Sequence, residues 1–491
     1  MSKHTAYFSP KQTSMDRRNF LRKTILAAAA AGASSGIPLS ALAMECQLVD
    51  TPRTLVNFML HGGADLRFLF MPAPNHQNSS YRDLLWTARR SLYDAAYGNY
   101  QQMFDNEYLL TTAPDTGFQF GIYRRAAWLK EQFEQGRVAV VANAYCSRNR
   151  RHDQSILNAD IGEPDLDVLN FDRAGWGGRL VEFLGNGANS VELGSSLSTF
   201  NKGSIAGARL EQVVHAQDMR DIALASPDDN SPATRRNIMA RALGAYYEAR
   251  GQEVAAEKPA NWPYHTFFQH NSALRAFGAT VEARLEACEP LSQELAGLQL
   301  GSAAFAQQCR NLFDVCQVPD ALNLGVVSMN YGGWDTHDNE AVEIGGNLQD
   351  IFGEDAGLAT AMSAIETLPW LERPASSQLV FYFASDFGRQ IIANGAAGTD
   401  HGRGTYSLLM GEAVRGGIYG EMFPDQEARP DLDGNVPLQT PGADIEGLTS
   451  TERILEAATD WVRPGAGSMV FPNTAFSGLE PGVDFGALFR S

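Results

Sequence analysis

Cysteine, long apolar runs and basic residues are all scarce in this sequence. Five cysteines in 491 residues are an odd number at low density, which argues against a disulfide framework. Past residue 43, no stretch is long and apolar enough to predict a membrane helix. Lys and Arg number 39 against 57 Asp and Glu, so the formal charge is −18 and nucleic acid is not an expected partner. The sequence therefore predicts a soluble globular protein.

The first 43 residues have the pattern of an export signal. Paired Arg17 and Arg18 precede an apolar stretch, and Ala41 to Ala43 form a small-residue cleavage site. This pattern predicts a twin-arginine signal peptide over 1–43, the twin-arginine translocation machinery as a partner, and a periplasmic or secreted location. Removing 1–43 takes away six Lys and Arg and one Asp, so the formal charge falls from −18 to −23.

Two cysteines, Cys309 and Cys316, fall on one predicted helical stripe with Phe305 and Leu312. Two turns of helix separate them by about 10 Å, which is too far for a disulfide bond. We expect them to be core residues.

Five short apolar runs predict buried strands, at 54–60, 138–145, 324–331, 379–385 and 406–411. Their apolarity is continuous, as in strands of parallel sheets covered on both faces. Helix-like segments precede the second run at 123–136 and the fourth at 355–368. The fold class predicted for 44–491 is therefore α/β, with a largely parallel sheet and helices on both faces.

Residues 186–318 depart from this alternation. Loops rich in Ser, Asn and Gly give way to helical patterns, and 226–236 has the composition of a linker. A mostly helical insertion and an outer layer of the same domain both fit, and the insertion is the reading we favour.

Acids and histidines follow the ends of the predicted strands. Because the carboxyl ends of parallel strands share one edge of a sheet, these side chains are expected to converge. Neutral imidazole with carboxylate oxygen predicts a divalent metal site for zinc, manganese, calcium or magnesium. The candidate ligands are Asp65, Asp335, His337, Asp386, Asp400 and His401, with His152 as a candidate catalytic residue.

Glycines around Asp400 and His401 allow the close backbone approach that such a site needs. Taken singly, each of these motifs is also typical of a turn or a helix cap. Their recurrence after successive strands favours the metal site.

Arginines occur in the same turns, at Arg150, Arg389 and Arg403 among others. In so acidic a chain they predict an anionic ligand such as phosphate or sulfate. Neutralisation of the neighbouring aspartates is the alternative.

At these motifs the chain resembles a family of twin-arginine-exported bacterial proteins of unknown function in the alkaline phosphatase and sulfatase clan. The resemblance rests on "GGAD" at 62–65, "NRRHDQS" at 149–155, "GGWDTH" at 332–337, "SDFGR" at 385–389, "GTDHGRG" at 398–404 and "GGIYGE" at 416–421. It implies an alkaline-phosphatase-like fold and metal ligation by Asp65, Asp335, His337, Asp400 and His401.

The resemblance also implies a nucleophile near the second strand end. Arg151 stands where related proteins often carry Ser. Cys146, Ser147 and Ser155 lie nearby in the sequence, and Ser147 is the candidate nucleophile. The expected function is a periplasmic metal-dependent hydrolase of phosphate or sulfate esters, acting on a small anionic ester or an envelope component. The alternative is a non-catalytic exported binding or assembly protein with a structural metal.

Overall fold

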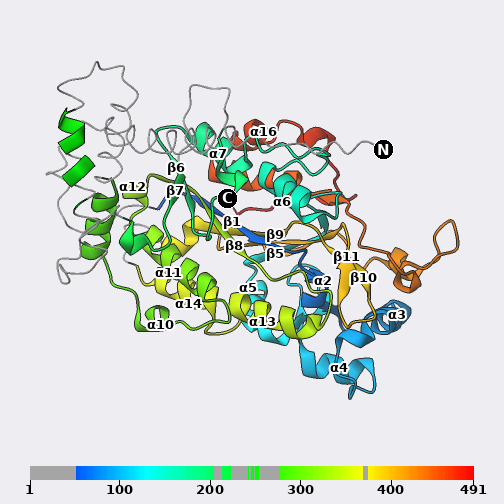
Figure 1. The fold of residues 1–491 in the computed structure, drawn as a ribbon. Coiled ribbons are helices and arrows are strands. Elements are labelled where there is room, and N and C mark those ends of the chain that lie inside the picture. Colours follow the sequence, from blue (N-terminus) through cyan, green and yellow to red (C-terminus); the bar gives the residue numbers. More distant parts are fainter. Residues whose placement is uncertain are drawn as a thin grey trace, which may run out of the picture.

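A computed structural model describes residues 51–203, 213–222, 242, 245–247, 249–253, 277–368 and 374–490 (Figure 1). The predicted signal peptide at 1–43 and the predicted linker at 226–236 lie outside the described residues. No helix within the described ranges has the length and apolarity to cross a membrane.

All five predicted strands are present and buried: β1 (Thr54–Leu60), β5 (Val138–Tyr145), β8 (Leu324–Tyr331), β9 (Leu379–Ser385) and β12 (Thr405–Met410). Successive side chains of β1 enter different cores, because side chains alternate across a strand. Phe58 packs into the larger core and Met59 into the smaller one. This two-sided burial explains why each run is apolar without alternation.

These strands belong to one large sheet in the order β13-β5-β12-β9-β1-β8-β6-β7, with β14 also pairing with β5. Its other members are β6 (Asn189–Glu192), β7 (Val213–His215), β13 (Gly417–Tyr419) and β14 (Thr449–Ser450). The pairings are parallel except those of β12 with β5 and β9. The prediction of a largely parallel sheet is confirmed, with β12 as its antiparallel member.

Helices cover both faces of the sheet (Figure 1). Beside the smaller core lie α6 (His152–Ile161), α7 (Trp176–Leu184), α15 (Thr451–Val462) and α16 (Ala466–Val470). Beside the larger core lie α2 (Leu66–Leu69), α3 (Ser79–Arg89), α4 (Tyr100–Glu107), α5 (Ala127–Glu134), α10 (Gln293–Ala296), α11 (Ala303–Gln317), α12 (Pro319–Leu322), α13 (Glu340–Phe352) and α14 (Gly357–Glu366). The helices predicted within 123–136 and 355–368 correspond to α5 and α14.

Smaller elements complete the described chain. One three-stranded sheet consists of β2 (Phe70–Pro72), β4 (Gln119–Tyr123) and β3 (Tyr108–Thr112), and a hairpin consists of β10 (Arg389–Ala393) and β11 (Thr399–His401). Short 3₁₀ helices occur at Arg90–Leu92, Arg124–Ala126, Thr199–Asn201, Met219–Asp221, Ala375–Gln378, Asp425–Ala428, Pro437–Gln439 and Thr474–Phe476.

The two ends of the 186–318 region belong to the main sheet and its core. β6 and β7 extend the large sheet, and α11 packs against its larger core. Much of the centre of this region lies outside the described residues. Cys309 and Cys316 on α11 are buried and not disulfide-bonded, so their prediction as core residues is confirmed. Cys288 is disulfide-bonded.

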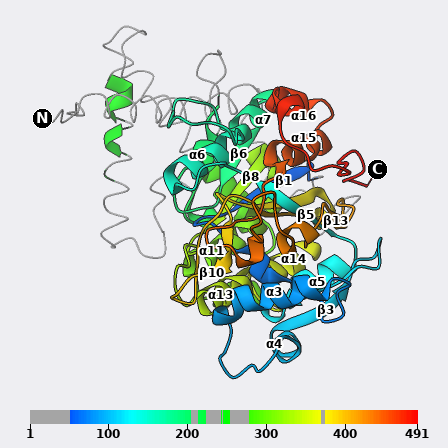
Figure 2. The same cartoon turned by 90° about the vertical axis from the view of Figure 1, so that its right-hand side faces the viewer.

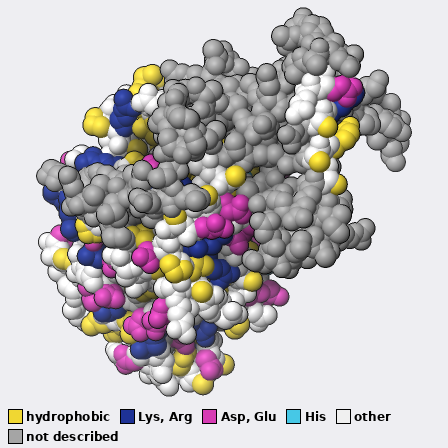
Figure 3. All heavy atoms as spheres, turned by 90° about the vertical axis from the view of Figure 1, so that its left-hand side faces the viewer, with side chains coloured by type: hydrophobic (Ala, Val, Ile, Leu, Met, Phe, Trp, Pro, Cys, Tyr) yellow, Lys and Arg dark blue, Asp and Glu magenta, His cyan; other side chains and the backbone are white. Residues whose placement is uncertain are grey.

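Acidic and basic side chains are interspersed over the described part of the face in Figure 3. The net negative charge is therefore not gathered into a single patch on that side of the molecule.

Candidate functional site

One edge of the large sheet gathers the predicted motifs. β1, β5, β8 and β9 all end there, and the β10–β11 hairpin lies beside them, on the side that Figure 2 turns toward the viewer. Because β12 is antiparallel, the segment that precedes it lies at this same edge. This direction of β12 brings Asp400 and His401 to the ends of the parallel strands.

At this edge Asp335 is surrounded by three histidines, and we call these four residues the Asp335 cluster. Its carboxylate lies 2.9 Å from Nε2 of His401, 3.1 Å from Nε2 of His337 and 3.5 Å from Nε2 of His152. The Nε2 atoms of His337 and His401 are 3.0 Å apart. Three separate segments of the chain supply these side chains.

The other ring nitrogen of each histidine faces a hydrogen-bond acceptor. The acceptors are Asp386 Oδ2 for His152 at 3.0 Å, Asp400 Oδ1 for His337 at 3.1 Å, and the carbonyl oxygen of Arg150 for His401 at 2.9 Å. A carboxylate or a carbonyl accepts only, so each Nδ1 carries the hydrogen. Each Nε2 therefore presents its lone pair toward Asp335, as in metal sites whose histidines are held by neighbouring carboxylates or carbonyls.

Lone pairs that converge in this way require a cation between them, either protons or a metal ion. Ligands about 2 Å from a tetrahedral zinc ion lie about 3.3 Å from one another, close to the separations in the Asp335 cluster. Nε2 of His152 is buried and has no hydrogen-bond partner among the described residues. Within the described residues, His152, Asp335 and His401 offer ligand atoms that all lie within 4.8 Å of one another. The residues present therefore fit a divalent metal ion.

The electrostatics of the Asp335 cluster favour an ionised acid. Burial raises the pKa of Asp335, but its contact with His401 and the hydrogen bond from Arg389 outweigh burial and lower the pKa to about 2. The hydrogen bond with Asp386 raises the pKa of His152. The side chains of Asp335 and His337 are 49% and 46% exposed, so a ligand from solvent can reach them.

Asp386 supports the cluster from beneath. Its Oδ1 accepts hydrogen bonds from the backbone N–H groups of Gly62 at 3.0 Å and Gly63 at 2.7 Å. Its Oδ2 faces His152, so both oxygens have partners in the protein. Burial raises the pKa of Asp386, but the hydrogen bonds from His152 and the two glycines have the larger effect. The pKa of Asp386 is therefore lowered. The structure thus places this predicted ligand behind His152.

Arg389, predicted to bind an anion, is also buried beneath the cluster. Its guanidinium donates to Asp335 Oδ1 at 2.7 Å and to four backbone carbonyls, those of Gly62, Gly63, Trp334 and Thr399. The side chain has no exposed surface. Arg389 therefore joins the segments after β1 and β8 to the hairpin.

Glycines permit the close approach that the hairpin requires. A Cβ atom at Gly398 would lie 2.2 Å from the carbonyl carbon of His337, and one at Gly402 would lie 2.5 Å from the carbonyl carbon of Arg389. Real Cβ atoms are not found so close to a backbone atom. The small residues around Asp400 and His401 are therefore required by packing.

Two predicted residues point elsewhere. Asp65 caps α2 through Phe68 N and forms a buried ion pair with Arg89. Ser147, the predicted nucleophile, is fully buried, and its Oγ accepts hydrogen bonds from Asn149 N at 3.0 Å and Asn158 Nδ2 at 3.1 Å. None of these hydrogen bonds or ion pairs joins Asp65 or Ser147 to the Asp335 cluster.

The two remaining predicted arginines share one acid. Arg150 lies 2.6 Å from Asp444 Oδ2, and Arg403 binds both oxygens of the same carboxylate, at 2.9 and 3.0 Å. The side chain of Asp444 is nearly buried, whereas Arg403 is exposed and Arg150 is partly exposed. The carbonyl of Arg150 contacts His401, so this pair lies beside the Asp335 cluster.

Two members of this region were not predicted. His61 directly follows β1, and its Nδ1 is buried and has no hydrogen-bond partner in the described ranges. Burial lowers the pKa of His61, and Asp386 and His152 are close enough to shift it too. Its place at a strand end, before two glycines, was a signal in the sequence. Asp444 lies far along the chain in an irregular segment and gave no such signal.

Comparison with known proteins bears on one part of the chain. Residues 299–431 match the family model described as "Protein of unknown function (DUF1501)". This stretch is therefore similar to a family of unknown function. It contains three of the four residues of the Asp335 cluster, and His152 lies outside it. No curated protein matches the chain significantly.

Proposed function

We propose that this protein is an exported, metal-dependent hydrolase of phosphate or sulfate esters, with the metal held by the Asp335 cluster. The observation that carries the proposal is the arrangement of three histidines whose Nδ1 atoms are held by acceptors while their Nε2 atoms face one carboxylate. A divalent cation in such a site polarises an ester oxygen and lowers the pKa of water. Three imidazoles with one carboxylate suit zinc better than calcium or magnesium, which prefer oxygen ligands.

Arg150 and Arg403 support an anionic substrate. Both guanidinium groups bind the carboxylate of Asp444 beside the cluster, where Arg403 is exposed and Arg150 is partly exposed. Guanidinium groups bind phosphate and sulfate oxygens well because their N–H groups match those oxygens in geometry. The resemblance of "GTDHGRG" to the alkaline phosphatase and sulfatase clan points the same way, and the export signal predicted in 1–43 suggests a periplasmic site of action.

The residues of the chain have distinct roles in this proposal. Asp386, Asp400 and the carbonyl of Arg150 hold the imidazoles in the tautomer that can bind a cation. Because Ser147 has no exposed surface, we assign the attack on the ester to water rather than to this hydroxyl.

Metal analysis of the natively exported protein tests the proposal. We expect about one zinc ion per chain in the wild type and loss of that ion in His401→Ala and Asp335→Ala. His215→Ala is the matched control, because it removes an exposed histidine of β7 outside the cluster. A wild type without stoichiometric metal, or cluster variants that keep it, would overturn the metal site.

A second function, binding or assembly with a structural metal, is favoured by the burial of Ser147. Metal-replete protein can be assayed against aryl phosphate monoesters, aryl phosphate diesters and aryl sulfates. Turnover that is lost in His401→Ala supports the hydrolase. Absence of turnover on all three classes, with metal bound, supports the non-catalytic function.

A further inference from the structure

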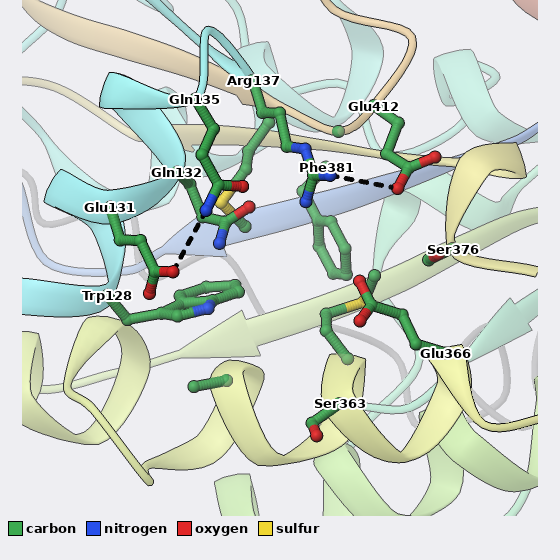
Figure 4. Close-up of a pocket in the computed structure, with 14 residues that line it drawn as sticks. Trp128, Glu131, Gln132, Gln135, Arg137, Ser363, Glu366, Ser376, Phe381 and Glu412 are labelled. Atoms are coloured by element: carbon green, nitrogen blue, oxygen red, sulfur yellow. Dashed lines mark hydrogen bonds and ion pairs between the residues drawn. The ribbon is translucent and has the colours of Figure 1, made fainter. Parts of the chain in front are cut away.

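A pocket of about 230 Å³ lies at the opposite edge of the sheet from the Asp335 cluster. It opens between α5 and α14, next to the start of β5 and the end of β12, and Figure 4 shows the side chains that line it. Its size suits a ligand smaller than those in typical drug-binding pockets, which measure roughly 300–1,000 Å³.

Part of the lining of this pocket is apolar. Phe381 of β9 and Met410 of β12 are buried and line it from the sheet, and Met362 of α14 lines it from the helices. Trp128 of α5 lines the pocket as a partly buried indole. Such a lining favours the apolar body of a ligand, and the indole face also attracts a cation.

Charged groups line the same pocket with an excess of acid. Glu131, Glu366 and Glu412 lie around it with a single arginine, Arg137. Arg137 Nη2 is 3.4 Å from Glu412 Oε1, and Glu131 accepts a hydrogen bond from Gln135 at 3.0 Å. Among the described residues, neither Glu131 nor Glu366 forms an ion pair with Lys or Arg. The pocket therefore favours a positively charged group.

A buried hydroxyl in the pocket lining has no partner. Ser376 belongs to the 3₁₀ helix at Ala375–Gln378, is 2% exposed and lines the pocket, yet its Oγ makes no hydrogen bond within the part of the chain that the structure describes. A buried hydroxyl without a partner is costly. A bound N–H donor that reached this side of the pocket would satisfy it.

We propose that this pocket binds a small organic cation, a protonated primary amine on a short apolar body. The ammonium group would lie against Trp128 and Glu366 and the apolar body against Phe381 and Met410. The pocket shares no residue with the Asp335 cluster, so the proposal does not depend on the proposed hydrolase.

Calorimetric titration of the full exported protein with hexylamine tests this site. We expect saturable binding of hexylamine, and at least tenfold weaker binding of its neutral and anionic counterparts, hexanol and hexanoate. Glu366→Gln and Trp128→Leu should each weaken hexylamine binding by about threefold to tenfold. Glu294→Gln, an exposed substitution on α10 outside the pocket, should leave it unchanged.

Several results would overturn the proposal. Hexanol that binds as tightly as hexylamine would show an apolar site without preference for charge. Glu366→Gln and Trp128→Leu proteins that melt like the wild type and bind hexylamine equally well would place binding elsewhere. Loss of hexylamine binding on metal chelation would show that hexylamine binds at the Asp335 cluster. Unchanged binding supports the separate pocket.

Discussion

Asp335 and Asp386 each follow a strand in the sequence, but the structure gives them different roles. Asp335 is half exposed and meets three imidazole Nε2 atoms. Asp386 is buried and meets an imidazole Nδ1 and two backbone N–H groups. This difference depends on Gly62 and Gly63, more than 300 positions away, so the local sequence could not distinguish the two acids.

We expect Asp386→Asn to weaken metal binding although it removes no ligand of the Asp335 cluster. The amide oxygen would keep accepting from Gly62 and Gly63, so the amide NH₂ would face His152 Nδ1. Nδ1 would then have to accept, and the hydrogen would move to Nε2, where it blocks coordination. Loss of such a supporting partner lowers metal affinity by about 10- to 100-fold. Competition with a chromophoric zinc chelator measures this affinity.

Asp153→Asn is the matched control for that experiment. Asp153 is next to His152 in sequence, but its carboxylate forms an exposed pair with Arg151. We expect its zinc affinity to equal that of the wild type. An Asp386→Asn protein with wild-type zinc affinity would contradict the role given to Asp386.

The β10–β11 hairpin is the element that completes the Asp335 cluster. Arg389 at its start joins it to the segments after β1 and β8, and His401 at its end places Nε2 2.9 Å from Asp335 Oδ1. The sequence predicted an anion-binding role for Arg389 because several arginines share the turns of the predicted metal ligands in a very acidic chain. That pattern could not indicate that four carbonyl groups from three segments would surround the guanidinium.

Gly398→Ala should damage this hairpin and the proposed metal site together. The added Cβ would lie 2.2 Å from the carbonyl carbon of His337, so the loop before β11 would have to move. Overpacking of this kind costs about 1–3 kcal/mol of stability. We expect a lower free energy of unfolding in denaturant titration and a weaker affinity for zinc.

Gly395→Ala provides the control in the same loop. No atom lies within 4 Å of a Cβ at Gly395, so this variant should keep both the stability and the zinc affinity of the wild type. If Gly398→Ala and Gly395→Ala behave alike, close packing of the loop against His337 is not what positions the hairpin.

For the whole molecule, the apolar runs predicted the strands and their covered faces well. Because parallel strands end at a shared edge, the sequence also indicated that Asp335, His337 and His401 would meet. The direction of β12 could not be predicted, since a strand buried on both faces has the same apolar pattern in either direction. Nor could the sequence indicate the backbone carbonyl that holds His401, because every residue carries one.

A metal ion in the Asp335 cluster would connect three segments: the one after β5, the one after β8 and the one before β12. Its removal should therefore lower the stability of the whole domain. Binding to the folded state alone adds about 2.7 kcal/mol at a zinc concentration 100-fold above Kd. Calorimetry should therefore give a melting temperature a few degrees higher with zinc than with a chelator. In His401→Ala the two scans should coincide, because one ligand atom is missing, whereas His215→Ala should keep the difference. Equal melting temperatures of the wild type with and without zinc would mean that no ion joins these segments.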